Sequence, residues 1–125
     1  MDNLVGNFLR VAVLWALAGM ALGIAMAASH NHQLMPVHAH VNLLGWVSMA
    51  LFGLFFRTHP AALAGRLPQL LFWLINFALA LMTVSLSALL LGVAAAEPVA
   101  ALSGFLLLGA MAIFAVIVFR ATRAA

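Results

Sequence analysis

The chain has 125 residues, of which 68% are hydrophobic and only 6% are charged. This composition lies outside the range of soluble globular domains and predicts an integral membrane protein. Because the chain has no cysteine, disulfides, iron–sulfur clusters and covalently attached c-type heme are excluded, and any metal must rely on histidine, methionine or oxygen ligands.

Four apolar runs are long enough to span the hydrocarbon core of a membrane, which needs about 20 residues per helix. The predicted helices cover residues 4–29, 37–57, 67–93 and 98–121. Pro36, Pro68 and Pro98 stand at the starts of the last three, where a missing amide N–H costs least. Short connections predict antiparallel neighbours. We therefore expect an all-α fold, a single transmembrane domain over residues 1–125 built as an integral membrane four-helix bundle.

The arginines predict the orientation of these helices. They occur in the N-terminal part, in the second connection and in the C-terminal part, as Arg10, Arg57, Arg66, Arg120 and Arg123. When four helices are threaded through a membrane, these segments share one side, which the positive-inside rule makes cytoplasmic. We expect a multi-pass protein of a bacterial inner (cytoplasmic) membrane, with both termini in the cytoplasm. Five scattered arginines also form no groove for phosphates, so we expect membrane lipid and no nucleic acid as a partner.

Two features inside the helices predict contacts between them. Gly19 and Gly23 in the first helix belong to a stripe of small residues, which lets a neighbouring helix approach closely. Asn76, Thr83 and Ser87 share one face of the third helix, and we expect them to form interhelical hydrogen bonds, because polar groups in lipid need partners. A cofactor or proton route is the alternative role for that face.

The second helix opens with two histidines, His38 and His40, separated by one alanine. Ionisable groups in or beside a membrane usually mark function, and imidazole is the commonest protein ligand for iron, copper and zinc. Since successive helical residues rotate by about 100°, the two rings point to nearly opposite sides and serve different sites. The face of His40 also contains Leu44, Val47 and Leu51. We expect both histidines to ligate a metal, preferably heme iron.

The face of His38 also contains Asn42, Gly45 and Met49. Gly45 would leave room for a flat macrocycle against the backbone, and Trp46 would pack on it. No catalytic residue is predicted. The predicted cofactor-binding residues are His38, His40, Asn42, Gly45, Trp46 and Met49.

His30 and His32 lie in or just before the first connection. With His38 and His40 they could form an all-nitrogen copper or zinc site. Alternatively they hydrogen-bond water or heme propionates, which we favour because a short loop constrains them poorly. His59, in the second connection, is expected to be a capping or interfacial residue.

The run His40-Val41-Asn42-Leu43-Leu44, followed by Phe52-Gly53, resembles the second transmembrane helix of the heme-copper oxidase subunit I superfamily, most closely in its nitric oxide reductase branch. In that family the corresponding histidine ligates the low-spin heme b. The pair His38-Ala39-His40 is also similar to the family's tenth helix, where a His-x-His pair sends one histidine to each of two hemes. The resemblance implies a heme b near the periplasmic face and a role in electron transfer or small-gas redox chemistry, with a quinol or a cytochrome as candidate redox partner.

Subunit I of that family has twelve helices in three four-helix arcs with approximate threefold symmetry. A four-helix chain with His-x-His in its second helix looks like one such arc, and three copies would complete the ring. The resemblance therefore implies a homotrimer in which His38 of one protomer and His40 of the next approach the same heme.

The chain departs from the family at the catalytic centre. It contains no tyrosine, no lysine and a single glutamate, Glu97. The family's oxygen-reducing centre uses a copper with three histidines and, in most branches, a tyrosine, and its nitric oxide reductases use glutamates near a non-heme iron. An enzymatic chain would thus be an oxidoreductase of heme-copper oxidase type without the complete oxygen-reducing centre. A copper or zinc delivery protein and a structural subunit of a respiratory complex are the alternatives.

Overall fold

The computed structural model describes residues 2–123, which are almost entirely helical and contain no strand. The elements are α1 (Asp2–Ser29), α2 (Met35–His40), η1 (Val41–Ser48), α3 (Met49–Thr58), η2 (Pro60–Leu63), α4 (Leu67–Leu90), η3 (Ala94–Ala96) and α5 (Glu97–Arg123). Because α2, η1 and α3 are continuous, these residues form four helices long and apolar enough to cross a membrane: Asn3–Ser29, Met35–Thr58, Leu67–Leu90 and Ala94–Arg123. The all-α expectation is confirmed for the described residues.

The third long helix ends three residues before the expected position 93. Gly92 adopts a positive φ of 99°, a conformation that favours glycine. The amide of Gly92 donates to the carbonyl of Leu89, and that of Val93 donates to the carbonyl of Ala88. This is the Schellman pattern, which stops a helix irrespective of how apolar the following residues are.

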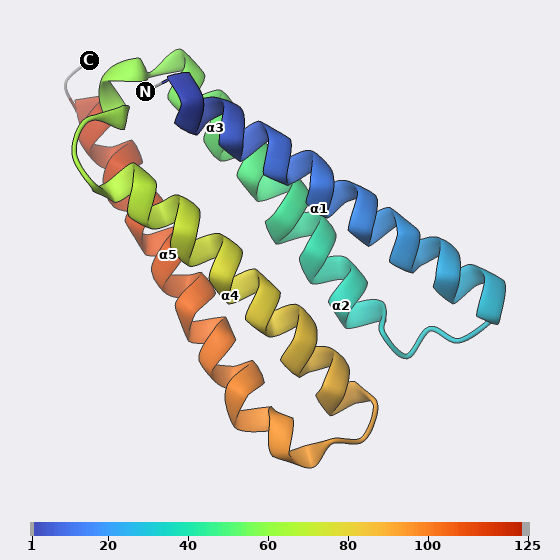
Figure 1. Ribbon diagram of the computed structural model, residues 1–125. Coiled ribbons are helices and arrows are strands. Elements are labelled where there is room, and N and C mark those ends of the chain that lie inside the picture. Colours follow the sequence, from blue (N-terminus) through green and yellow to red (C-terminus); the bar gives the residue numbers. More distant parts are fainter. Residues whose placement is uncertain (1, 124–125) are drawn as a thin grey trace.

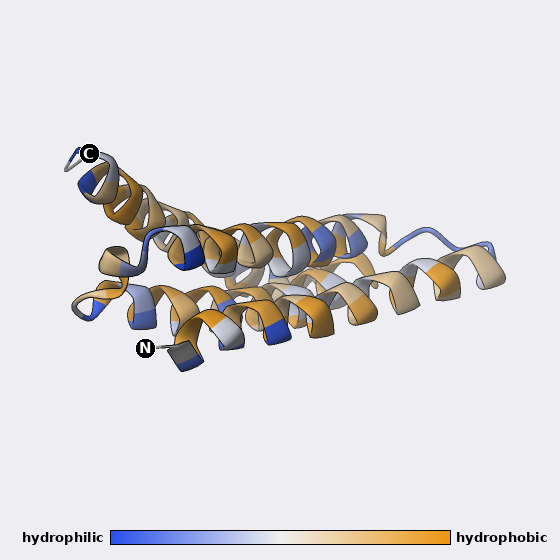
Figure 2. Ribbon diagram, turned by 90° about the horizontal axis from the view of Figure 1, so that it is seen from above, coloured by the Kyte–Doolittle hydropathy of each residue, from blue (hydrophilic) through white to orange (hydrophobic). Residues whose placement is uncertain are grey.

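The helices form two antiparallel hairpins (Figure 1). One pairs α1 with α2, η1 and α3, and the other pairs α4 with α5. The two chain ends and the connection 59–66 lie at one end of the bundle, which we call the arginine end because Arg57 and Arg120 occupy the last turns of α3 and α5 there. The connections 30–34 and 91–96 lie at the opposite end, and the first of them is visibly polar between hydrophobic helices (Figure 2).

An aromatic cluster joins the two hairpins toward the arginine end. Phe8 of α1 packs edge-on against Phe72 of α4, with ring centroids 5.1 Å apart. Phe52 of α3 packs against Phe114 of α5, with ring centroids 4.1 Å apart. Phe8 and Phe52 are almost completely buried and also contact each other, so each of the four long helices contributes a ring to one core.

The middle of the second long helix is a π-helix, η1. A side-chain hydrogen bond has the five-residue spacing of a π-helix: the Ser48 hydroxyl donates to the carbonyl of Leu43, five residues earlier, at 2.8 Å. π-Helical turns are rare and often occur at functional sites. This one begins directly after His40.

The polar face of α4 makes one interhelical hydrogen bond. The indole nitrogen of Trp15 in α1 donates to Oδ1 of Asn76 at 3.0 Å, as expected for a polar residue inside the bundle. Thr83 and Ser87 instead donate to carbonyls of their own helix, four residues earlier. The expectation of interhelical bonds is therefore wrong for these two hydroxyls, because a serine or threonine in a helix can satisfy itself locally.

We expect Asn76→Leu to lower the free energy of unfolding by about 1 kcal/mol, since the Trp15 N–H would lose its partner inside an apolar bundle. Thr83→Val is the matched control and should change stability by less than about 0.5 kcal/mol, because Thr83 bonds only within its own helix. Thermal unfolding in detergent, followed by circular dichroism, measures both. Equal effects of the two variants would contradict the assignment.

Candidate functional site

His38 lies half-buried in the last turn of α2, with its ring against α1. Its Nδ1 atom is 2.8 Å from the carbonyl oxygen of Gly19. Because a carbonyl oxygen only accepts, this contact assigns the proton to Nδ1, and the neutral ring then keeps an unprotonated Nε2. The Nδ2 atom of Asn42 is farther from Nδ1, at 3.3 Å, and has the carbonyl of His38 as its closer acceptor. Gly23 makes this position accessible, since a Cβ atom there would lie 2.8 Å from Cε1 of His38.

Asn42 occupies the neighbouring space on the same face. Its Nδ2 donates to the carbonyl of His38 at 2.8 Å, and a Cβ atom on Gly19 would lie 2.6 Å from that nitrogen. The second long helix approaches α1 closely at Gly19 and Gly23, as predicted. The absence of side chains at these two glycines makes room for Asn42 and His38, respectively. The expected pairing of His38 and Asn42 on one face holds in this geometry.

His40 is half-buried and is oriented by its own helix. Its Nδ1 lies 2.7 Å from the carbonyl oxygen of Pro36, four residues earlier. The same reasoning assigns the proton to Nδ1 and the lone pair to Nε2. Two histidines on different faces are thus held in the same tautomer by two different backbone carbonyls.

Neither Nε2 atom has a hydrogen-bond partner among the described residues. Within residues 3–123 there is also no buried side-chain nitrogen or oxygen without a partner. Both Nε2 atoms consequently reach the surface of this chain. Each offers a free lone pair to a metal ion or a hydrogen-bond donor outside the four helices.

Gly45 does not leave the room that was expected beside it, and Met49, predicted to bind the cofactor, does not reach the surface. A Cβ atom on Gly45 would lie 2.7 Å from the side chain of Trp15 and 2.9 Å from that of Leu79. Met49 is completely buried in the core. Because protein side chains already fill the space, neither residue can touch a macrocycle bound outside the helices. Sequence reasoning missed Trp15, although a long apolar run with one indole N–H signals a need for a polar partner.

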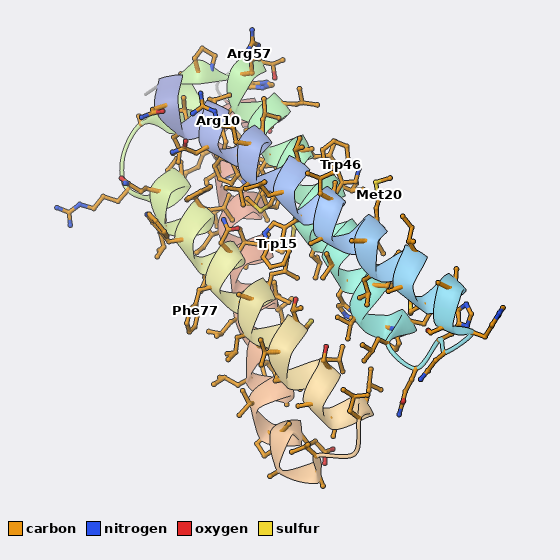
Figure 3. The ribbon with its side chains drawn as sticks, turned by 45° about the vertical axis from the view of Figure 1, so that its right-hand side comes forward. Arg10, Trp15, Met20, Trp46, Arg57 and Phe77 are labelled. Atoms are coloured by element: carbon orange, nitrogen blue, oxygen red, sulfur yellow. The ribbon has the colours of Figure 1, made fainter. Side chains whose placement is uncertain are left out.

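The outward face of the second long helix is apolar. Trp46 is 39% exposed, and Met20 of α1 is 60% exposed (both are labelled in Figure 3). Val47 and Leu51, expected on the face of His40, are exposed as well, and Leu44 is half-buried. This surface can contact either lipid or an apolar group from another molecule.

His30 and His32 are exposed in the first connection. His30 directly follows α1 with a positive φ of 54°, and the connection is attached to α4 through Gln33, which donates to the carbonyl of Leu90. Among the side chains described for residues 3–123, no three from histidine, aspartate or glutamate are close enough to hold a metal ion. The alternative of a four-histidine copper or zinc site is therefore not formed among the described residues of one chain.

His59 caps α3, as expected. Its ring stacks on Phe55 with centroids 4.4 Å apart and 14° between the planes. Its Nδ1 lies 2.9 Å from the Thr58 hydroxyl oxygen and 3.2 Å from the carbonyl of Phe55. The structure thus places His59 at the arginine end, far from the other histidines.

Comparisons of the chain with protein-family models, with curated proteins and with solved structures found no match. The geometry of His38 and His40 is therefore the main indication of function in this chain.

Proposed function

We propose that this protein binds heme b in a membrane, with His38 and His40 ligating iron through Nε2 close to the end of the bundle that contains the first connection. The observation that supports the proposal is the state of the two rings: each Nδ1 donates to a backbone carbonyl, at 2.8 Å for His38 and 2.7 Å for His40. Metal-ligating histidines usually have this second bond, which fixes the ring and its tautomer and makes the other nitrogen a better donor.

Heme fits this donor set better than copper or zinc does. A protein zinc site needs three or four side-chain ligands around one ion, and the described residues do not gather three. A heme needs only one or two axial ligands from protein, because its macrocycle supplies the other four nitrogens. With no cysteine in the chain, the heme would be held without covalent attachment, as a b-type heme.

A homotrimer explains why the histidines face apart. Since the rings lie on nearly opposite sides of α2, one chain cannot give both to the same iron. In the proposed assembly, His38 of one protomer and His40 of the next ligate one heme between them. The exposed apolar side chains of Met20 and Trp46 are available to cover such a group and to contact the neighbouring protomer. The resemblance of the His-x-His helix to one arc of subunit I of the heme-copper oxidases supports three copies.

Bound heme supplies a one-electron iron couple, and the residues of the chain decide its use. With histidine on both sides of the iron, the protein would transfer electrons between a quinol or a cytochrome and another carrier. With one histidine, an open position would bind a small gas. The fixed rings of His38 and His40 favour electron transfer, because rigid ligands need little rearrangement when the iron changes its charge. The arginine end would face the cytoplasm of a bacterial inner membrane, and the histidines its periplasm.

The proposal predicts one heme per protomer and a trimer in the protein purified from heme-supplied cells. A reduced-minus-oxidised spectrum should show low-spin b-type bands, and a pyridine hemochrome assay should give a ratio of about one heme per chain for a heme shared at each interface. Light scattering with correction for detergent gives the subunit number. A metal-free monomer would contradict the proposal, and a heme-free protein that contains copper or zinc would favour the metal-delivery alternative.

A further inference from the structure

A second candidate site lies at the arginine end, far from the histidine pair. It is a pocket of about 420 Å³ between the second connection, the start of α4 and the last turns of α5. Its walls are mostly apolar, and they include Pro60, Leu67 and Ile117. Two nitrogen-rich side chains also line it, His59 and Arg120.

The guanidinium of Arg120 gives this pocket a fixed positive charge. Glu97 is the one carboxylate whose side chain is described, and it begins the same helix 23 residues earlier, about 35 Å away at 1.5 Å per residue. A guanidinium at a membrane surface pairs well with phosphate, which it can hold through two parallel hydrogen bonds. Arg66 and Arg123 lie at the same end and add to the positive field.

His59 contributes an acceptor. Its Nδ1 lies against the carbonyl of Phe55, which can only accept, so the proton of the neutral ring is on Nδ1 and Nε2 has a lone pair. The Thr58 hydroxyl donates to the carbonyls of Leu54 and Phe55 and can accept from the same Nδ1–H. Stacking on Phe55 holds the ring in place. A hydroxyl group on the ligand would satisfy Nε2.

We propose that this pocket binds an anionic phospholipid whose headgroup contains a hydroxyl, such as phosphatidylglycerol. Arg120 pairs with the phosphate, Nε2 of His59 accepts from the headgroup hydroxyl, and the first carbons of an acyl chain lie on the apolar wall near Leu67 and Ile117. The combination of one cation, one acceptor and an apolar wall at the end of a membrane-spanning bundle matches this amphiphile in all three parts. The site is independent of heme binding.

Native mass spectrometry of the purified protein tests the site with phosphatidylglycerol, phosphatidic acid and phosphatidylcholine added at equal concentration. We expect phosphatidylglycerol to bind most tightly, and Arg120→Gln to weaken it about tenfold, as expected for losing a hydrogen bond to a charged group. Arg123→Gln is the matched control, since Arg123 is in the same last turn but does not line the pocket, and it should leave binding unchanged. His59→Phe should lower phosphatidylglycerol binding to the level of phosphatidic acid.

A further variant tests the wall itself. Ala121→Leu narrows the pocket without altering a charge, and it should also displace the lipid if the acyl chain lies there. Inorganic phosphate at the same concentration should not compete, because it lacks the apolar part. Equal losses in Arg120→Gln and Arg123→Gln, equal binding of phosphatidylglycerol and phosphatidylcholine, or displacement by a quinone at equal concentration would each overturn the assignment.

Discussion

Replacing both His38 and His40 by alanine should remove heme from the purified protein, with at least about a tenfold fall in heme per chain. Changing a residue that only supports a metal ligand already costs 10- to 100-fold in metal affinity, so losing the ligands themselves must cost at least as much. The single variants should behave differently from the double variant. Each would leave one axial histidine per heme, so we expect a five-coordinate, high-spin spectrum with weaker retention. Absorption spectra of the oxidised and reduced proteins measure the coordination, and hemochrome assays measure the content.

His59→Ala is the control for this series. His59 follows α3 at the arginine end and is no part of the proposed heme site, so this variant should keep the low-spin spectrum and the full heme content. A histidine variant that loses helix content would also lose heme, whether or not the histidine is a ligand. Far-UV circular dichroism of each variant therefore measures its helix content. Unchanged low-spin heme in both single variants would refute the ligand assignment, whatever the fate of the oligomer.

Most of the fold could be predicted from the sequence because hydropathy and proline act locally. Twenty apolar residues in a row form a helix in lipid regardless of what surrounds them, and Pro36 and Pro68 indicate where two of the helices begin. The end of α4 was harder to predict. An apolar run continues through Val93, and only the backbone geometry of Gly92 shows that the helix stops earlier.

The candidate site could be predicted only in part. The opposite directions of His38 and His40 follow from helical rotation alone, and so does the pairing of His38 with Asn42. The carbonyl that orients His38 belongs to Gly19 in another helix. Because every residue has a backbone carbonyl, the sequence does not show which one will accept this hydrogen bond. The occupant of the space beside Gly45 could not be predicted either, because a glycine in the sequence does not indicate which neighbouring group will fill the space.

Gly45→Ala should destabilise the bundle by about 1–3 kcal/mol, the usual cost of overpacking a filled core. The added methyl would lie 2.7 Å from Cβ and Cγ of Trp15, atoms that cannot move far because they are close to the α1 backbone. The methyl would also lie 2.9 Å from Cδ2 of Leu79 in α4, so two side chains from two neighbouring helices would have to shift. The bond from Trp15 to Asn76 would be strained by the same displacement. Thermal unfolding of the heme-free protein in detergent measures the effect.

Gly109→Ala separates this packing effect from the general preference of helices for alanine. No atom lies within 4 Å of a Cβ atom at Gly109, so this change should stabilise α5 by about 0.5–1 kcal/mol or leave it unchanged. The comparison also decides what fills the space at Gly45. If Trp15 fills it, Gly45→Ala destabilises the heme-free chain, and its heme loss follows its unfolding. If a macrocycle lay there instead, the heme-free chain would keep its stability and only the heme content would fall.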